Sequence, residues 1–318
     1  MTTRPAVALL GLLALTTLSP AVAPAHADGP ANPLQATDGF YADPDSNSAQ
    51  WVKDNPDAER APTIKKEIAD KPGALWLGDW TADPKAAVEA YTKAAQAENK
   101  MPVLVTYNIP GRDCKGESDG GADSPEEYRT WISQFAEGLG DRPAVVILEP
   151  DALAQYDCLP DQGPTRLELL HFASDQMAGH PNTWAYMDAG HSSWIDSGEM
   201  ANRLKQVGVE GIRGFALNTS NYQTTEDSVA YGKAVNDAIG GTSHYVVDTS
   251  RNGTGPKGDE WCNPEGRKIG VPAQTSDDAD MLLWVKNVGD SDGDCGLGEG
   301  TKAGDFTPEL AMHLITGE

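Results

Sequence analysis

Two aspartates stand close behind two apolar segments of this 318-residue chain. Asp113 follows the segment Val103–Tyr107, and Asp151 follows the segment Ala144–Leu148. When two carboxyl groups lie near each other, charge on one disfavours charge on the other, so one of them stays protonated. Cleavage of a glycosidic bond needs such a pair, because one carboxyl protonates the leaving oxygen while a carboxylate activates water or attacks the anomeric carbon. Asp113 and Asp151 therefore predict the chemistry of a glycoside hydrolase.

Polar side chains follow the other apolar segments in the same manner. They are Asp79, Asp188, His191, Asn218, Asn221, Asp248, Arg251, Lys286, Asp290 and Asp292. A single aspartate after a strand is more often a helix N-cap or a turn former. The repetition behind nearly every segment favours one shared site, because the working residues of parallel barrels lie beyond the carboxyl ends of the strands.

Tryptophans occur in the same loops as these polar side chains. Trp76, Trp80, Trp194 and Trp261 offer flat apolar faces with one hydrogen-bond donor, which suit stacking against sugar rings. Each of them could instead belong to a core, and we expect that of Trp284. A phosphate site would be rich in glycines, lysines and arginines. Aromatic and acidic side chains together therefore predict a carbohydrate cleft.

Seven short apolar segments indicate buried parallel strands. They are residues 75–77, 103–107, 144–148, 183–187, 212–217, 244–247 and 281–285. Helical patterns separate most of them, as the crossover between parallel strands requires. Seven strands can close into a barrel or stay in an open doubly wound sheet, but no glycine-rich phosphate motif of the open nucleotide-binding form follows any strand. We therefore expect an α/β barrel.

Two helices have explicit start signals. Ser124 is a predicted N-cap, with a proline at the first helical position and a glutamate at the capping-box position behind it. Apolar residues then recur at helical spacing, and Gly138 is expected to end this helix. Asp83 opens another helix in the same manner.

The first residues have the features of an export signal. One positive charge, at Arg4, precedes an apolar stretch over residues 6–18, and Ala25-His26-Ala27 matches a small-x-small cleavage site. The stretch falls short of the ~20 apolar residues that span a membrane. We expect residues 1–27 to be a signal peptide and residues 28–318 to be a single catalytic domain of a secreted, extracellular protein. No Pro/Ser/Thr-rich linker indicates a further module.

The chain is strongly acidic, with a formal net charge of −24, which becomes −25 when residues 1–27 and their single charge at Arg4 are removed. This charge disfavours nucleic acid or an anionic membrane surface as a partner and is compatible with a neutral polymer. It serves solubility equally well, so it does not identify a substrate.

Four cysteines follow the expected cleavage site. Pairing of sequence neighbours joins Cys114 to Cys158 and Cys262 to Cys295, as suits an oxidising compartment. A metal site is the alternative, but the chain has no Cys-x-x-Cys or His-x-x-x-His spacing. We expect two disulfides, no metal and no cofactor.

These residues stand in segments that resemble glycoside hydrolase family 6, the inverting cellobiohydrolases and endoglucanases. The matching segments are residues 107–114, 120–121, 146–153, 187–194, 218–222, 248–256, 260–262 and 284–293, spread over nearly all of the mature chain. The resemblance implies a distorted seven-stranded parallel β/α barrel, no metal, and the same disulfide pairing.

The resemblance also implies roles for individual residues. Asp151 would be the general acid, and Asp113 would raise its proton affinity and help to hold the hydrolytic water. Asp292 matches an aspartate often proposed as the base. Tyr107 would press on the sugar ring at the cleavage point. The other implied roles are sugar contacts, with hydrogen bonds by Asp188, His191, Asn221, Lys286 and Asp290 and stacking by Trp76, Trp194 and Trp261.

Three positions depart from the family pattern. Asp290 stands where members usually carry glutamate, so its carboxylate reaches one methylene less far. Asp119 stands where a serine is common in the water-holding loop, and Asp294 is an extra residue. The loops that roof the cleft into a tunnel in cellobiohydrolases are short here, in residues 188–218 and 248–286. The expected function is an inverting endo-β-1,4-glucanase that hydrolyses cellulose or a related β-glucan.

Three other functions fit parts of the pattern. They are a cellobiohydrolase of the same family, a barrel that binds polysaccharide without cleaving it, and a secreted structural or adhesion protein. The presence of both Asp113 and Asp151 disfavours the non-catalytic barrel, and the lack of repeats or linkers disfavours the adhesion protein. We expect a monomer whose partner is a β-1,4-glucan chain.

Overall fold

The computed structural model describes residues 1–2, 32–159 and 161–318. Nearly all of the predicted signal peptide therefore lies outside the described residues. The strands are β1 (Ala74–Gly78), β2 (Val103–Tyr107), β3 (Ala144–Leu148), β4 (Thr183–Asp188), β5 (Gly214–Leu217), β6 (His244–Asp248), β7 (Gln274–Thr275) and β8 (Met281–Leu283). The helices are α1 (Asn47–Asp54), α2 (Ala61–Ile64), α3 (Pro84–Ala97), α4 (Pro125–Leu139), α5 (Gly163–Ala178), α6 (Ser197–Gln206), α7 (Thr225–Ile239) and α8 (Pro308–Thr316), with short helical turns η1 (Pro33–Gln35), η2 (Lys65–Ala69), η3 (Asp113–Lys115), η4 (Val209–Gly211) and η5 (Gly296–Gly298).

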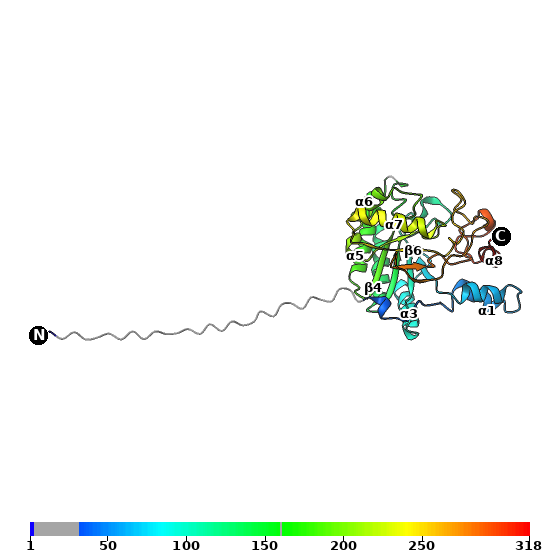
Figure 1. Cartoon of the computed structure of the whole chain (residues 1–318), viewed down its shortest axis with the longest axis horizontal. Coiled ribbons are helices and arrows are strands. Elements are labelled where there is room, and N and C mark those ends of the chain that lie inside the picture. Colours follow the sequence, from blue (N-terminus) through cyan, green and yellow to red (C-terminus); the bar gives the residue numbers. More distant parts are fainter. Residues whose placement is uncertain (3–31, 160) are drawn as a thin grey trace.

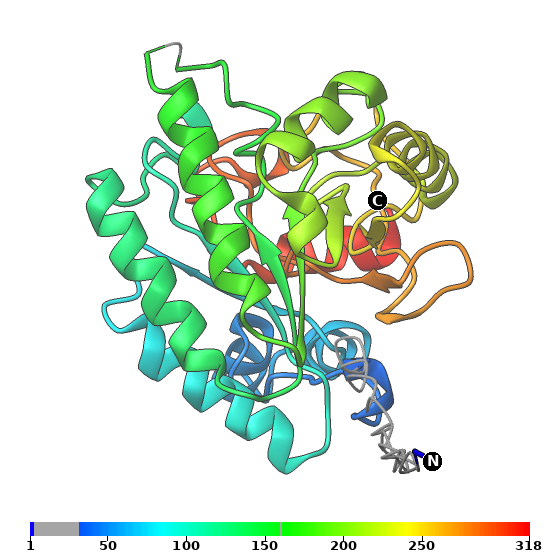
Figure 2. The ribbon, with the colours of Figure 1, turned by 90° about the vertical axis from the view of Figure 1, so that its left-hand side faces the viewer.

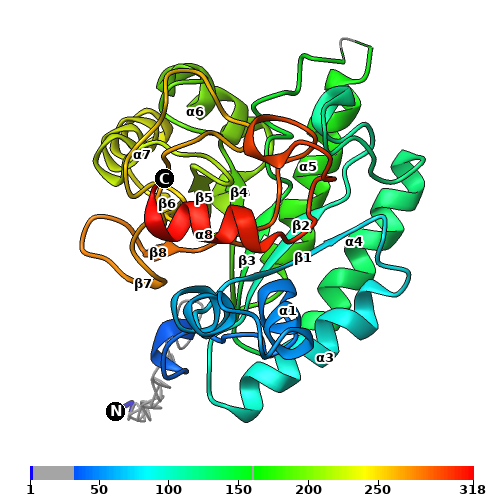
Figure 3. The ribbon, with the colours of Figure 1, turned by 90° about the vertical axis from the view of Figure 1, so that its right-hand side faces the viewer.

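The strands form one curled sheet with helices around its outer side (Figures 1 and 3). The strand order is β1-β2-β3-β4-β5-β6-β8-β7, and all neighbours are parallel except β7 and β8. The seven predicted strands and the barrel-like α/β fold are confirmed. The prediction missed β7, because a strand of two residues is too short to leave a periodic pattern. This order leaves β1 at one edge of the sheet and the β7–β8 pair at the other.

Alternate side chains of the central strands enter two different cores. Leu104 and Leu148 point outward and pack with the helices. Val105 and Ile147 point inward and belong to a second core that fills the curl of the sheet. Both faces of these strands are therefore buried, which explains why their sequences are continuous apolar runs.

The predicted helix starts are confirmed. Ser124 Oγ accepts a hydrogen bond from the Glu127 amide (3.1 Å), and Asp83 Oδ1 accepts one from the Ala86 amide (2.9 Å), at the N-termini of α4 and α3. The Glu127 carboxylate accepts from the amide of Asp123 (3.0 Å), one residue before the cap. These caps satisfy amides that have no partner inside the helix.

The prediction that Gly138 ends α4 is wrong. The helix continues to Leu139, and Gly140, with φ of 54°, is the C-cap residue. A Cβ on Gly138 would lie 2.7 Å from the carbonyl oxygen of Lys85 and 2.8 Å from Val88 Cβ, both on α3. Gly138 therefore lets α3 and α4 pack closely, and these two helices and α5 lie side by side in Figure 2.

A third core closes the C-terminal side of the sheet. Trp284, directly after β8, is 3% exposed and packs with Ile68, Ala311 and Leu314, which belong to η2 and α8. The prediction that Trp284 is a core residue is confirmed. The indole of Trp76 in β1 donates to the carbonyl oxygen of Val285 (2.8 Å), so a side chain connects the two edge regions of the curled sheet.

Both predicted disulfides are present, between Cys114 and Cys158 and between Cys262 and Cys295. Each bridge lies beyond the carboxyl ends of the strands and joins two loops there. Of the described residues, no helix combines the length and the apolar character needed to span a membrane.

Candidate active site

The loop that carries Asp151 turns sharply at the carboxyl end of β3. Glu149 and Asp151 have φ of 47° and 68°, a backbone region that residues other than glycine seldom adopt. Glu149 Oε2 accepts hydrogen bonds from the amides of Asn108 (2.8 Å) and Ile109 (2.9 Å), and the hydroxyl of Tyr128 donates to Oε1 (3.1 Å). Glu149 is fully buried and ties this loop to the loop after β2, which offsets the cost of the strained backbone.

Asp188, the last residue of β4, holds the same loop from the other side. Its Oδ1 accepts from the amides of Asp151 (2.9 Å) and Gly190 (3.1 Å). Asp188 is fully buried. Its predicted sugar contact therefore stays a prediction, because the structure gives its carboxylate a positioning contact and no exposed oxygen.

Asp151 is adapted to keep a proton. Burial raises its pKa well above the usual range of an aspartate, and the charges of Asp188 and Asp113 raise it further. Asp292 adds to this effect, while Lys286 opposes it. A carboxyl whose pKa is raised in this way keeps its proton more readily and can donate it to a leaving oxygen, as the predicted acid must.

Asp113 lies in a tight turn of the loop after β2. Its φ is 56°, and its Oδ2 accepts from the amide of Ser118 (2.7 Å). Burial raises the pKa of Asp113. The bridge from Cys114 to Cys158 connects this turn to the segment behind Asp151. The structure therefore brings the two predicted carboxyls together and links their loops covalently.

An arginine that was not predicted as a site residue organises the wall of the cleft. The guanidinium of Arg112 lies 4.6 Å from the ring centroid of Tyr107 and 5.2 Å from that of Trp80. It donates to Asp79 (2.9 Å) and to the carbonyl oxygen of Tyr107 (2.7 Å). Trp76 meets Tyr107 edge to face, with centroids 5.2 Å apart. These contacts fix the ring that is predicted to press on the sugar.

Asp292 is surrounded by cations and donors. Its Oδ2 accepts from Arg251 (2.7 Å) and from the amide of Asn263 (3.0 Å), with the hydroxyl of Tyr222 at 3.4 Å. Lys286 Nζ lies 3.1 Å from Oδ1. Burial alone would raise the pKa of Asp292, but Arg251 and Lys286 lower it to about 2. Asp292 is therefore charged at all ordinary pH values.

Asp248, at the end of β6, holds three loops through backbone amides. Its Oδ1 accepts from Ser250 (2.8 Å) and Val285 (3.2 Å), and its Oδ2 from Ser220 (2.9 Å) and Lys286 (3.0 Å). Asp248 is 1% exposed. It follows that Asp248 positions the backbone of Lys286 and does not contact a ligand.

A second group of predicted residues forms the rim at β4, β5 and the loop after β6. Trp194 and Trp261 are 37% and 53% exposed, so their faces are open for stacking. The ring of His191 lies 5.5 Å from that of Trp194, and burial lowers the pKa of His191 to about 4, which keeps it neutral. Asn221 donates to the carbonyl oxygen of Thr219 (3.1 Å), so its amide group is oriented by its own loop.

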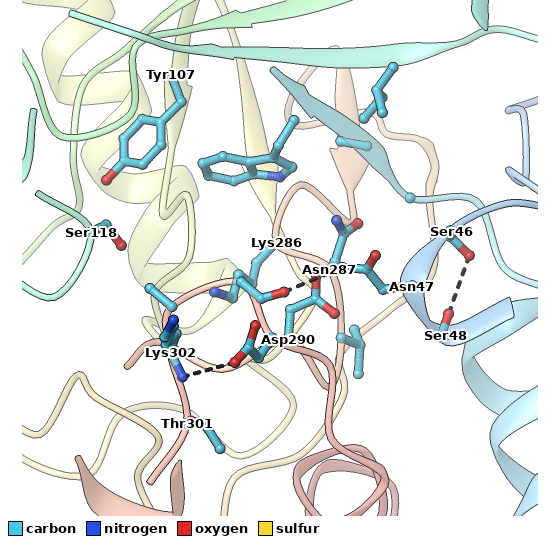
Figure 4. Close-up of a pocket in the computed structure, with 18 of the residues that line it drawn as sticks. Ser46, Asn47, Ser48, Tyr107, Ser118, Lys286, Asn287, Asp290, Thr301 and Lys302 are labelled. Atoms are coloured by element: carbon cyan, nitrogen blue, oxygen red, sulfur yellow. Dashed lines mark hydrogen bonds between the residues drawn. The ribbon is translucent and has the colours of Figure 1, made fainter. Parts of the chain in front are cut away.

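The main cavity has a volume of about 900 Å³ and lies along β1 and the loop after β8 (Figure 4). Trp76, Tyr107, Lys286 and Asp290 line it. Asp151, His191, Trp194, Asn221 and Trp261 lie outside its lining. The predicted residues therefore divide between the lining of this cavity and a group at the strand ends outside it. Within the described parts of the chain, no group of His, Cys, Asp and Glu side chains could hold a metal ion.

The chain matches the model of glycosyl hydrolases family 6 over residues 35–317. It belongs to this family. Endoglucanase 1 of Streptomyces halstedii is 49% identical over 97% of this chain and 97% of that protein. Endoglucanase A of Thermobispora bispora is 41% identical over 98% of this chain and 69% of that protein.

Solved structures of the family have the same fold. The endoglucanase Cel6 of Mycobacterium tuberculosis, in complex with methyl-cellobiosyl-4-deoxy-4-thio-β-D-cellobioside, has a TM-score of 0.84 and 43% identity over 90% of this chain and 99% of that chain. Cellobiohydrolase II of Humicola insolens, at 22% identity, has a TM-score of 0.78 over 90% of this chain and 98% of that chain. The family 6 fold is therefore common to proteins of both descriptions.

Sequence reasoning missed the residues of this family 6 site that act through other residues. Glu149 and Arg112 stand inside segments that were recognised, but nothing in their spacing shows that they bond to neighbouring loops. Arg251 could have been predicted more easily, because a buried aspartate in a loop needs a cation or several amides as partners. The sequence indicated that Arg251 follows a strand, but not that it pairs with Asp292, 41 residues away.

The coupling between Asp188 and Asp151 predicts a shifted pH profile. Asp188→Asn removes a charge that raises the pKa of Asp151 and keeps an oxygen for the Asp151 amide. Asp151 then loses its proton at lower pH, so the basic limb of kcat/KM on a soluble β-glucan should move to lower pH. Asp237→Asn, on the exposed side of α7, is the control and should leave the limb in place. An unmoved basic limb in Asp188→Asn contradicts the coupling.

Proposed function

We propose that this family 6 enzyme is an inverting endo-β-1,4-glucanase that acts on cellulose or a related β-glucan. The observation that carries the proposal is the strongly raised pKa of Asp151, with the charge of Asp113 nearby, at strand ends that also carry an aromatic-lined cavity and exposed tryptophans. The names of the relatives support it, because two of them are called endoglucanases at 49% and 41% identity. The complex of the structural relative with a thio-linked cellobiosyl cellobioside supports a β-glucan as substrate.

Asp151 gives its proton to the oxygen of the departing sugar in this mechanism. Tyr107 faces the ring whose anomeric carbon is attacked, and Asp113 helps to hold the attacking water on the opposite side of that carbon. The proton that this water loses passes through a second water to the Asp113 carboxylate. Attack from the opposite side inverts the configuration, so a β-linkage yields an α-anomer. The raised pKa of Asp151 supplies the acid, and the network around Arg112 keeps Tyr107 in place.

We assign Asp292 a charged, positioning role and not that of a direct base. Its oxygens already face Arg251, Lys286 and the amide of Asn263. A carboxylate with a pKa of about 2 is also a weak proton acceptor at the pH at which Asp151 is protonated. Its negative charge instead balances Lys286 and raises the proton affinity of Asp151.

Internal cleavage of a chain requires a cleft that a polymer can enter from the side. The exposed faces of Trp194 and Trp261 support an open rim. Glu117 contacts the loop after β8, where the amide of Asp294 donates to its carboxylate (3.1 Å) and its side chain packs against Gly293. Asp294 and Glu117 are both exposed, so we expect this contact to open and admit the polymer.

The first test of the function uses Asp151→Asn. General acid assistance is worth a factor of about 10² to 10⁴, so the variant should lose that much activity on carboxymethylcellulose and still bind it. The wild-type chain should lower the viscosity of the solution well before much reducing sugar appears, and proton NMR should show the α-anomer as the first product. Wild-type turnover by Asp151→Asn, or a β-anomer as the first product, refutes the mechanism.

The role of Asp292 predicts the response of Asp292→Ala to azide. If Asp292 positions Lys286 and Arg251, the variant should be slower and less stable, because two buried cations lose their partner. Added azide should not restore turnover. Rescue by azide with an inverted product would instead identify Asp292 as the base. Turnover with and without azide is measured beside melting curves, with Lys286→Ala as the reference for stability.

We also propose that the chain is exported and loses residues 1–27, which lie almost wholly outside the described residues. The two disulfides support an oxidising compartment. Protein collected from the culture medium should begin near Asp28 by N-terminal sequencing and should contain no free thiol. Active protein retained in the cell with an intact N-terminus and four free thiols would count against export.

A further inference from the structure

The cleft continues past Trp76 into the opening between the two edges of the sheet. Beyond Trp76 the cavity is lined by Ser46, Asn47 and Ser48 at the start of α1, by Lys71, and by Asn287 and Asp290 in the loop after β8. Figure 4 shows these groups in a row that leads from Tyr107 through Lys286 and Asn287 to Asn47 and then to Ser46 and Ser48. The cavity of about 900 Å³ is near the upper end of the ~300–1,000 Å³ of ligand pockets, so it has room for more than one sugar ring.

Asn47 is held in place at this end by Asp290. The Asn47 amide donates to Asp290 Oδ2 (2.8 Å) and to the carbonyl oxygen of Gly304 (3.3 Å). Asp290 is 7% exposed, whereas Asn47 is exposed and lines the cavity. Because Asp290 Oδ2 accepts a hydrogen bond from Asn47, 243 residues away in the sequence, it fixes the orientation of the Asn47 side chain. Asp290 is therefore a positioning residue for Asn47.

Asn47 offers the cavity an oxygen that the described residues leave without a donor. Its amide nitrogen donates to Asp290 and to Gly304, whereas its Oδ1 accepts no hydrogen bond from these residues. Asn47 is exposed and lines the cavity, so a ligand there can donate to this oxygen. The hydroxyls of Ser46 and Ser48, 3.3 Å apart, add two groups that can both donate and accept.

We propose that Asn47, oriented by Asp290, is the centre of a binding site for a third glucosyl unit. This inference rests on the proposed function. The first unit lies at Tyr107, where its anomeric carbon is attacked, the second on Trp76, and the third beside Asn47 with Ser46 and Ser48. Uncharged amide and hydroxyl groups suit a neutral sugar, whose hydroxyls can each both donate and accept hydrogen bonds. The site makes the enzyme prefer chains with at least three units on the side that keeps the attacked carbon.

Hydrolysis of cellopentaose in ¹⁸O-water measures how often a substrate occupies this third position. The new reducing end takes the label, so labelled cellotriose comes from chains with three units on the Tyr107 side, and labelled cellobiose from chains with two. One neutral hydrogen bond is worth a factor of about 2 to 10, so Asn47→Ala should lower the ratio of labelled cellotriose to labelled cellobiose by that factor. Gln50→Ala, on the same helix but bonded to Asp54, is the matched control and should keep the wild-type ratio.

Cellotriose separates a lost sugar contact from a damaged fold. It is too short to fill the third position and also to cross the cleavage point, so its kcat/KM should be the same in Asn47→Ala and in the wild type. A wild-type product ratio in Asn47→Ala overturns the proposal. Equal losses on cellotriose and cellopentaose also overturn it, because Asn47 would then only join α1 to the loop after β8.

Calorimetry with Asp151→Asn as the background tests binding without hydrolysis. Adding Asn47→Ala should weaken the binding of cellopentaose and leave that of cellobiose unchanged. Failure of the wild-type chain to cleave glucans would refute the proposed function but not the third binding position. The binding measurement still tests that position in such a case. If Asp151→Asn binds cellopentaose equally well with and without Asn47→Ala, the third position is refuted even in an active enzyme.

Discussion

Carboxyl groups buried at the ends of the parallel strands determine the rest of this site. A buried carboxylate needs amides or cations at its oxygens, or it keeps its proton. The structure uses each solution at a different strand. Glu149 and Asp248 accept backbone amides, Asp292 faces Arg251 and Lys286, and Asp151 has the strongly raised pKa of a proton holder. Asp151, the proposed acid, differs from these neighbours because burial and the nearby charges of Asp188 and Asp113 favour its protonated form.

These carboxyls also connect the loops mechanically. Glu149 links the loop after β3 to the loop after β2, and Asp188 links it to the loop after β4. Asp248 links the loops after β5, β6 and β8. In each link a buried carboxylate accepts a hydrogen bond from a backbone amide, so these loops are fixed relative to the strand ends. Such a network offsets the strained backbone at Glu149 and Asp151.

The sequence predicted what local patterns determine. Buried parallel strands are continuous apolar runs because both of their faces are covered, so all seven could be found, and the N-caps of α3 and α4 have side chains typical of their positions. The prediction for Gly138 was wrong because a glycine suits both a helix end and a close contact between two helices. Only the structure, which places Val88 of α3 against Gly138, distinguishes the two cases. The Asn47–Asp290 bond spans 243 residues and leaves no signal in either local segment. The family resemblance located the carboxyls but did not show which of them bond to backbone and which face the cleft.

The opening between β1 and the β7–β8 pair keeps the cavity apart from the hydrogen-bonded sheet that holds the enzyme together. A closed barrel fills its interior with side chains, so enlarging its interior would remove core contacts. Here the two edges are joined by the indole of Trp76, and the space beyond it is bordered by α1 and the loop after β8. Substitution of an exposed side chain that lines this space, such as Asn47 at the start of α1, leaves the hydrogen-bond ladder of the sheet intact. The proposed site for a third glucosyl unit can therefore be redesigned at such positions at little cost to folding.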